Sequence, residues 1–269
     1  MKLCRFDDDR LGLVRGACVH DVTAALEALP SVRWPLPRHD PLIARLPALR
    51  PAIEAQADRS PPLPLDSRVL RSPVANAGKI IAARRNYPPG PAGTADLFLK
   101  ATSSVAGAGE GIELGVSGRS CKHEIELAVV IGATAAAVDP GRAMACVAGY
   151  CIGLDMTLSG EEDRGLRKSA DTFTILGPWL TTADEVPDAG VLEIELAVGG
   201  EVRQRGSTGD MLLGPAALIS AASRLVTLHA GDILLTGSPA GAAPVIGGDV
   251  LDCQIGRLGS MRVAVRGPT

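Results

Sequence analysis

Residues 121–132 read Cys-Lys-His-Glu-Ile-Glu-Leu-Ala-Val-Val-Ile-Gly, an apolar run that opens with two glutamates one residue apart. Alternate side chains of a β-strand share a face, so Glu124 and Glu126 are expected side by side on one face of a strand. The hexapeptide Glu-Ile-Glu-Leu-Ala-Val occurs again at residues 193–198. Because an acidic face is also typical of a half-exposed strand, the surroundings must show which copy has a chemical role.

The surroundings of the first copy contain a third acid. Residues 148–156 read Ala-Gly-Tyr-Cys-Ile-Gly-Leu-Asp-Met, so Asp155 stands at the end of a second apolar strand, where an unpaired charge is unfavourable. Three carboxylates that converge from two strands form a hard-oxygen site suited to Mg²⁺ or Mn²⁺. The second copy has no comparable acid behind it, so it is interpreted as a solvent-facing hairpin strand.

The rest of the chain alternates short apolar segments with glycine and proline, which predicts a mainly β fold with some α (α+β). The expected strands lie at 79–83, 125–131, 192–198, 232–235, 250–255 and 261–265. Expected helices begin at 141 and cover 215–228. The sequence lacks the fingerprint of a doubly wound dinucleotide-binding fold and has no phosphate-binding P-loop.

Residues 1–71 differ in texture from the rest. We expect a small N-terminal module of short strands with a helix at 21–29, followed by a proline-rich linker. The helix is indicated by apolar residues at helical spacing that follow a candidate N-cap and stop before Pro30. Residues 72–269, which contain the three acids, are expected to form a second, larger domain.

The composition excludes several classes of partner. With 27 basic and 30 acidic side chains the net charge is −3, so no global field draws the protein onto nucleic acid or an anionic membrane. Aromatic residues make up only 3%, which leaves few platforms for stacking bases. Six scattered cysteines predict reduced thiols, and no apolar stretch is long enough to span a bilayer, so we expect a cytoplasmic protein.

Four ordered segments of the chain resemble the fumarylacetoacetate hydrolase (FAH) family: 124–132, 149–155, 168–179 and 228–241. The likeness extends over residues 79–265. It implies an FAH-like mixed β-roll, usually a homodimer, with a divalent cation at Glu124, Glu126 and Asp155. The implied cation is Mg²⁺ or Mn²⁺, with Ca²⁺ as a further option. The resemblance also implies small-molecule substrates that are 2-oxo or 2,4-dioxo acids, which chelate the cation through neighbouring oxygens.

The same resemblance implies roles for residues around these acids. Lys168 matches the family's active-site lysine, and Thr236 matches a substrate-contacting threonine in Thr-Gly-Thr-Pro, which reads Thr-Gly-Ser-Pro here. The implied substrate-binding residues are Arg85, Asn86, Tyr87, Lys100, Gln204, Thr236 and Gly237. The cationic members are suited to hold a substrate carboxylate or a developing oxyanion. For Lys100, the alternative is a solubilising charge at a strand edge.

The sequence departs from the family at the water-activating base. Hydrolytic members place a His and then a Glu on a lid just after the Asn-Tyr pair, whereas Tyr87 is followed here by Pro-Pro-Gly-Pro-Ala-Gly-Thr. The remaining base candidates are His123 and Glu162. His123 adjoins Glu124 but is expected on the opposite strand face, as a surface or supporting imidazole. Glu162 lies in a loop, where acids are usually solvated.

Taken together, these features favour a divalent-metal-dependent hydrolase of carbon–carbon bonds in small 2,4-dioxo acids, of the acylpyruvate or fumarylpyruvate type, in aromatic-compound catabolism. A bound cation stabilises the enolate that forms when the bond beside a chelating carbonyl breaks. Because the lid base is missing, two alternatives stay open. One is a decarboxylase, tautomerase or isomerase of 2-oxo dicarboxylic acids, for which the enolate suffices. The other is a non-catalytic protein that binds a metal and an oxo acid.

Overall fold

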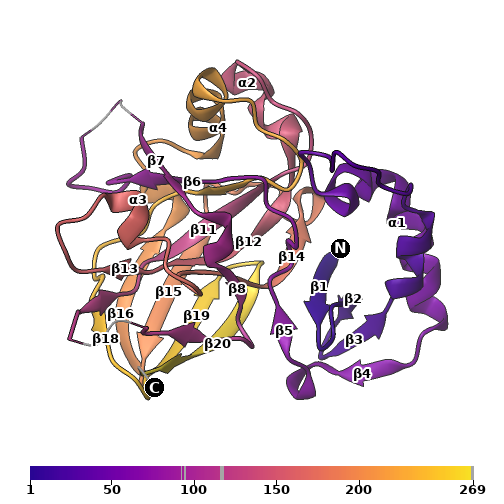
Figure 1. The fold of residues 1–269 in the computed structure, drawn as a ribbon, viewed down its shortest axis with the longest axis horizontal. Helices are drawn as coiled ribbons and strands as arrows, with labels where there is room; N and C mark the ends of the chain where they lie inside the picture. Colours follow the sequence, from indigo (N-terminus) through magenta and orange to yellow (C-terminus); the bar gives the residue numbers. More distant parts are fainter. Residues whose placement is uncertain (92, 94, 116–117, 268–269) are drawn as a thin grey trace.

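The computed structural model describes residues 1–91, 93, 95–115 and 118–267, and its fold is mainly β with few helices, as predicted. Within these residues the largest sheet has 12 strands (Figure 1). Its main path is β4 (Pro62–Pro64), β3 (Cys18–Asp21), β2 (Arg10–Arg15), β1 (Lys2–Phe6), β14 (Thr174–Thr182), β12 (Val147–Asp155), β11 (Ile125–Ile131), β17 (Ile233–Leu235), β6 (Ile80–Arg84) and β7 (Asp96–Lys100). Beside this path, β5 (Leu70–Arg71) pairs with β1, and β8 (Val105–Gly107) pairs with β14.

Two smaller sheets and a few helices complete the described structure. One sheet has the order β16 (Glu201–Ser207), β15 (Glu193–Val198), β19 (Val250–Ile255), β20 (Gly259–Arg266) and β9 (Ile112–Glu113). The other has the order β13 (Thr157–Leu158), β10 (Cys121–Lys122) and β18 (Pro244–Val245). The α-helices are α1 (Pro41–Arg59), α2 (Pro140–Ala143), α3 (Arg164–Arg167) and α4 (Pro215–Leu225). Among the described residues, no helix is both long and apolar enough to cross a membrane.

The strands predicted from apolar alternation are present. Both β11 and β19 have the predicted bounds, and the other four predicted strands differ from the observed ones by one or two residues at an end. The helix expected at 215–228 is α4, which ends at Leu225, and α2 begins at Pro140, one residue before its predicted start. Apolar runs and apolar periodicity therefore sufficed to locate these strands and helices.

The N-terminal 71 residues contain the main departure from prediction. The helix expected at 21–29 is only a 3₁₀ turn, η1 (Thr23–Ala28), and the segment read as proline-rich irregular structure contains the 19-residue helix α1. The carboxylate of Asp40 caps α1 by accepting from the Ile43 N–H at 3.0 Å. Pro47 and Pro51 each remove a helical hydrogen bond, but α1 buries an apolar stripe that offsets this cost. The stripe consists of Ile43, Leu46, Leu49, Ile53 and Ala57.

The N-terminal strands continue the large sheet. Strand β1 pairs antiparallel with β14, with Leu3 opposite Leu180. Figure 1 shows these indigo strands and α1 at one end of the molecule, beside the larger part that carries the remaining sheets. The division into a module of residues 1–71 and a catalytic domain of residues 72–269 stays a prediction, and its last two residues lie outside the described part of the chain.

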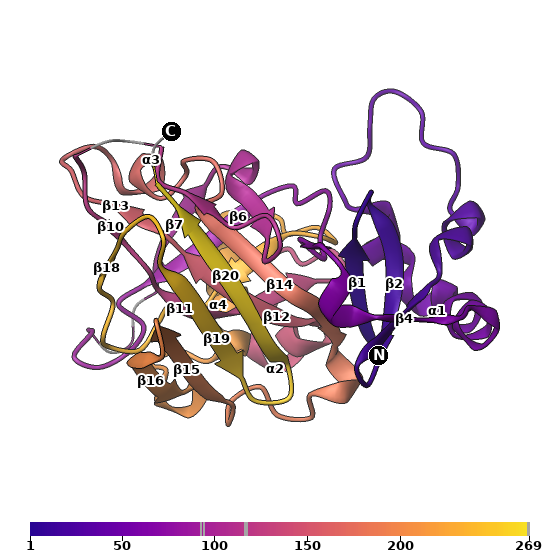
Figure 2. The same ribbon diagram turned by 90° about the horizontal axis from the view of Figure 1, so that it is seen from below.

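Strand β11 lies at the centre of the molecule, with all seven residues buried. The side chains at 125, 127, 129 and 131 join a core shared with β15, β19 and β20, which lie over the large sheet in Figure 2. Those at 128 and 130 join a second core, on the face that α1 covers. Glu126 lies on this second face and is buried, so its carboxylate lies in largely apolar surroundings, where a charge is unfavourable.

Candidate metal centre

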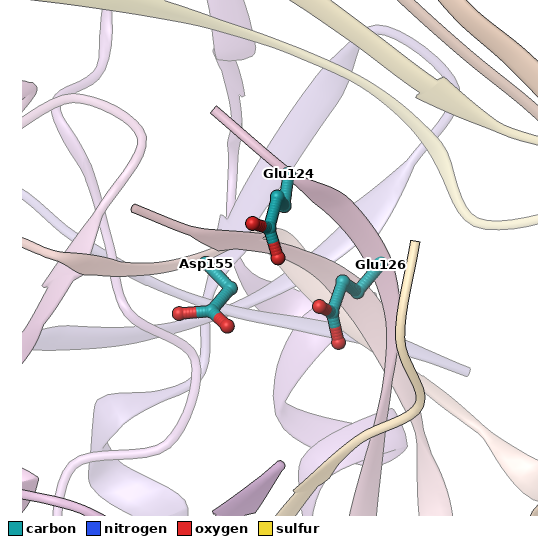
Figure 3. A group of neighbouring side chains, drawn as sticks. All are labelled: Glu124, Glu126 and Asp155. Carbon is teal, nitrogen blue, oxygen red and sulfur yellow. The ribbon is translucent and has the colours of Figure 1, made fainter. Parts of the chain in front are cut away.

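Three carboxylates converge at one end of β11 and β12, and Figure 3 shows their oxygens directed toward one another. Glu124 precedes β11, Glu126 lies within it, and Asp155 ends β12. The Asp155 N–H donates to the Glu124 carbonyl at 2.9 Å, which aligns the two strand ends. One ligand oxygen from each acid lies within 4.8 Å of the other two. The prediction that these acids meet is confirmed, and the group offers the oxygen ligands that a divalent cation prefers.

Burial makes this cluster of like charges unfavourable by itself. Glu126 and Asp155 are 1% exposed, while the side chain of Glu124 is 27% exposed, so the cluster opens to solvent on the Glu124 side. Burial, reinforced by the charges of Asp155 and Glu124, raises the pKa of Glu126 well above its usual value. A divalent cation offsets the repulsion between carboxylates, so the residues present fit a metal ion.

Two buried lysines neutralise part of the negative charge. Lys168, just after α3, donates from Nζ to Asp155 Oδ2 at 2.6 Å and to Glu124 Oε2 at 2.9 Å. Lys100, at the end of β7, donates to Asp155 Oδ1 and to the Phe173 carbonyl. Burial acts to lower the pKa of Lys168, but the surrounding carboxylates outweigh it and raise the pKa, whereas burial prevails at Lys100 and lowers its pKa. Lys100 is 4% exposed, so the alternative of a solubilising edge charge is wrong.

Asn86 fixes the segment that follows β17 against the acids. Its Nδ2 donates to the carbonyls of Thr236 and Leu213, both at 2.8 Å, and its Oδ1 accepts from the Leu213 N–H at 2.9 Å. The Gly237 N–H then donates to Glu126 Oε2 at 2.7 Å. Gly237 has φ +88°, and a Cβ there would lie 3.0 Å from that of Asn86, so the position favours glycine. The Thr236 hydroxyl is engaged with the main chain, because it donates to the carbonyl of residue 127 at 3.0 Å.

Tyr87 and Arg85 occupy different environments. The Tyr87 hydroxyl is buried and has no hydrogen-bond partner within the described residues. Burial and the nearby charge of Glu126 raise its pKa, so the hydroxyl keeps its proton beside the acids. Arg85 is exposed and adopts a left-handed backbone with φ 55°, which is unusual for a residue other than glycine.

Comparison with known proteins agrees with this geometry. The sequence profile described as fumarylacetoacetate (FAA) hydrolase C-terminal matches residues 69–266. The chain belongs to the fumarylacetoacetate hydrolase family. It is similar to a maleylpyruvate hydrolase from Aquipseudomonas alcaligenes, with 48% identity over an alignment of 285 positions that covers 99% of both chains.

Two solved structures extend the comparison. Maleylpyruvate hydrolase from Sphingobium sp. SYK-6, in complex with manganese(II) and pyruvate, has 39% identity and a TM-score of 0.89 over 100% of both chains. A probable 2-hydroxyhepta-2,4-diene-1,7-dioate isomerase from Mycobacterium abscessus has 30% identity and a TM-score of 0.81, over 100% of this chain and 98% of its own. The predicted family, fold and activity class are confirmed: the chain is a metal-dependent hydrolase of carbon–carbon bonds.

In this member of the fumarylacetoacetate hydrolase family, the base candidate His123 is buried and bound by Gln204. His123 Nδ1 lies 2.9 Å from Gln204 Oε1, which also accepts from the Ile125 N–H at 3.1 Å. Gln204 Nε2 donates to the Pro239 carbonyl at 2.7 Å and to the Ser238 hydroxyl at 3.1 Å. Burial lowers the pKa of His123. Of the two positions expected for this imidazole, the surface position is wrong, because the side chain is fully buried. The pair braces the start of β11.

The other candidate base, Glu162, is exposed on the loop before α3. Its two oxygens accept from the Arg119 guanidinium at 2.8 Å each, and this pairing lowers the pKa of Glu162. A carboxylate with a lowered pKa is a weaker base. Ala92 and Thr94, in the connection between Tyr87 and Phe98 that lacks the expected His-Glu pair, lie outside the described residues.

Two side chains beside Lys168 were not among the predicted site residues. The centroid of the Phe98 ring lies 5.7 Å from Lys168 Nζ and 5.9 Å from Arg164 Cζ. Arg164 stands four residues before Lys168, a spacing that places both on one side of a helical turn. That spacing is the signal in the sequence for Arg164, whereas the position of the Phe98 ring depends on the packing of β7 against α3.

Proposed function

We propose that this enzyme hydrolyses maleylpyruvate, or a closely related 2,4-dioxo dicarboxylic acid from aromatic-compound breakdown. Water cleaves the bond between the 4-oxo carbon and the neighbouring methylene, so maleylpyruvate gives maleate and pyruvate. One observation carries the proposal: three carboxylates and two buried lysines meet in a chain that is 48% identical, over 99% of its length, to a maleylpyruvate hydrolase.

The proposed metal ligands are Glu124, Glu126 and Asp155. A divalent cation supplies Lewis acidity, because it withdraws electrons from a chelating carbonyl and thereby stabilises an enolate. Mn²⁺ is the first choice because a relative that is 39% identical over 100% of both chains is described in complex with manganese(II), and Mg²⁺ and Ca²⁺ follow. The exposed edge of Glu124 marks the side from which substrate enters.

Each of the two lysines has one N–H donor without a partner among the described residues. An ammonium group has three N–H donors, and both Lys168 and Lys100 use two of theirs on protein oxygens. We assign the third donor of Lys168 to the substrate carboxylate or the developing oxyanion, where a fixed positive charge stabilises the transition state. Lys100 lies deeper and holds Asp155 in position.

The other predicted residues near the acids have different proposed roles. The polar side-chain atoms of Asn86 and Gln204 are already bonded to the protein, so both are proposed as positioning residues. Thr236 and Gly237 belong to the segment after β17 that Asn86 holds against Glu126. Tyr87 has a buried hydroxyl without a partner in the described structure, which suits a hydrogen bond to a substrate oxygen.

The test is turnover by metal-reloaded protein. Chelator-treated enzyme is reloaded with Mn²⁺, Mg²⁺ or Ca²⁺, and maleylpyruvate is followed by loss of ultraviolet absorbance while pyruvate and maleate are quantified. We expect equal amounts of both products, the fastest turnover with Mn²⁺, and none after chelation. Release of carbon dioxide, or a double-bond shift without pyruvate, favours the decarboxylase or isomerase alternative. Absence of turnover of any oxo or dioxo acid favours the non-catalytic alternative.

A homodimer and a cytoplasmic location complete the proposal. The homodimer follows from the family resemblance, and light scattering coupled to size-exclusion chromatography tests it. We expect a mass near twice the 27.7 kDa of one chain. A monomer at micromolar concentration contradicts this part and leaves the proposed reaction untouched. Cell fractionation tests the location.

A further inference from the structure

The candidate metal centre has a closed side and an open side. Glu126, Asp155 and Lys100 are between 1% and 4% exposed and close the inner side, whereas the Glu124 side chain is 27% exposed. A substrate that chelates a cation at these acids therefore extends its far end past Glu124 toward solvent. Maleylpyruvate carries a second carboxylate at that far end, so an anion needs a partner on the open side.

Arg164 lies near Lys168, the cation that contacts the partly exposed Glu124. It begins α3, one helical turn before Lys168, and both cations lie near the ring of Phe98, at 5.9 Å and 5.7 Å from its centroid. Burial, with the positive charges of Arg84 and Arg167, lowers the pKa of Arg164, and the charge of Glu124 opposes this. The guanidinium thus lies within reach of the charge of Glu124, among other cations, where a bound anion is favourable.

The neighbouring arginines are occupied and Arg164 is not. Arg84 pairs with Asp96 at 3.3 Å, and Arg119 pairs with Glu162 at 2.8 Å. Arg167 donates to main-chain carbonyls at 2.9 Å and 3.0 Å. Over residues 1–91, 93, 95–115 and 118–267, the Arg164 guanidinium has neither a hydrogen bond nor an ion pair.

Open space adjoins the Arg164 side chain. With Phe98, Leu99 and Asp163 it lines a cavity of about 420 Å³ between β7 and α4, whose lining does not include the three carboxylates. Arg164 is half-buried, and the Asp163 carboxylate in the same lining accepts from the Gly165 N–H at 2.8 Å rather than from the guanidinium. A planar guanidinium binds a carboxylate through two parallel hydrogen bonds, which a single ammonium does not reproduce.

We propose that Arg164 binds the distal carboxylate of a dicarboxylic 2,4-dioxo acid and selects such acids over acylpyruvates that end in a methyl group. This inference rests on the proposed function, because it names the part of the same site that reads the far end of the substrate. Arg85, which is exposed just after β6, is the competing anchor.

Paired substrates test the assignment. Maleylpyruvate and acetylpyruvate share the dioxo acid end, and only the first has a distal carboxylate. R164Q is expected to lower kcat/KM for maleylpyruvate about tenfold or more, mainly through KM, because it removes a charge-assisted hydrogen bond. For acetylpyruvate the change in kcat/KM stays within about twofold, since this substrate has no distal carboxylate for Arg164 to bind. R164K retains the charge without the bidentate geometry and is expected to fall between wild type and R164Q.

Two further variants separate Arg164 from a general charge effect. R142Q removes an exposed positive charge on α2 and is expected to change neither substrate. If R85Q shows the selective loss and R164Q does not, Arg85 is the anchor and the inference is overturned. An equal loss for both substrates in R164Q, or no loss, also overturns it. Circular dichroism melting checks that each variant is folded.

Binding distinguishes this inference from the proposed function. If the wild type hydrolyses neither substrate, the proposed function fails, and calorimetry with the manganese-loaded protein still tests Arg164. The probes are 2-oxoheptanedioate and 2-oxoheptanoate, which differ only in the distal carboxylate. R164Q must weaken binding of the first about tenfold while it leaves the second unchanged. If both probes weaken equally, or neither does, Arg164 does not read the distal carboxylate.

Discussion

The hexapeptide Glu-Ile-Glu-Leu-Ala-Val occurs twice, at 124–129 and at 193–198, and the two copies share a fold but not a chemistry. Each forms a strand or its start, β11 in the large sheet and β15 in the five-stranded sheet. The Ile and Leu of both copies enter the same core. These residues are Ile125, Leu127, Ile194 and Leu196, each at most 1% exposed.

The glutamates of the two copies have opposite surroundings. Glu126 is 1% exposed and lies with Glu124 and Asp155, so like charges are held together inside the protein. Glu195 lies on the β15–β16 hairpin, where its carboxylate accepts from Arg205 at 2.6 Å in an exposed ion pair. The second copy is thus the solvent-facing hairpin strand that its surroundings predict. The comparison teaches that local sequence selects the strand, while the neighbouring strands decide whether its acids do chemistry.

The largest difference is expected when the third residue of the hexapeptide loses its charge. E126Q keeps the side-chain volume but removes a buried ligand, so Mn²⁺ affinity should fall at least about 100-fold, together with hydrolysis. E195Q should leave both within about twofold, because an exposed ion pair contributes little. Calorimetric titration with Mn²⁺ and the maleylpyruvate assay measure the pair. If both variants behave alike, burial among other acids is not what distinguishes the two copies.

The partner cations sharpen the same comparison. Lys168 pairs with the first copy and Arg205 with the second. K168M should lower kcat on the order of 10² to 10³-fold, because it removes a positive charge placed to stabilise a developing oxyanion. R205M should leave kcat unchanged within about twofold. Mn²⁺ affinity is measured in both variants, so that a loss of metal is not mistaken for a loss of catalysis. Full activity of K168M would falsify the assigned role.

Substitutions of the buried apolar residues are expected to have similar effects on stability in the two copies. Leu127 and Leu196 are both 0% exposed in one core. L127A and L196A should each lower the free energy of unfolding by about 2–5 kcal/mol, since each removes buried methyl groups and leaves a cavity. Urea unfolding followed by circular dichroism measures the loss. A change below about 1 kcal/mol in only one variant shows that the two copies do not share a core role.

The same contrast explains what the sequence predicts about the fold. Strand β19 alternates buried and exposed residues, while β11 is a nearly continuous apolar run buried on both faces, and each pattern locates the ends of its strand. Helix α1 was missed because Pro47 and Pro51 are typical of loops, and its stability comes from burial against strands that local sequence does not name. Propensity is a weak guide where tertiary packing outweighs it.

The site divides in a similar way. The sequence predicts the cluster of acids at 124, 126 and 155, because strand alternation places the two glutamates on one face and Asp155 ends a second apolar strand. Contacts between distant segments have no local pattern in the sequence. Arg119 binds Glu162 across a separation of 43 residues, and Gln204 binds His123 across a separation of 81. The Arg119 contact engages both oxygens of the candidate base Glu162, whereas Gln204 engages only Nδ1 of the candidate base His123, whose buried Nε2 has no partner among the described residues. Residue type and spacing thus find ligands on paired strands, but they do not show which side chains another segment has already engaged.

The smallest effect is expected from the Glu195–Arg205 pair, whose side chains are 40% and 67% exposed. Solvent screens this pair, and ordering two long side chains opposes it, so its coupling energy should be below about 1 kcal/mol. A double-mutant cycle of E195A, R205A and the double variant, measured by urea unfolding, gives this energy, and added salt should reduce it further. A salt-insensitive coupling above about 2 kcal/mol contradicts the solvated character of the second copy, because only a desolvated pair interacts so strongly. The acids of both copies would then be structurally engaged, and burial alone could no longer explain why only one copy belongs to the metal centre.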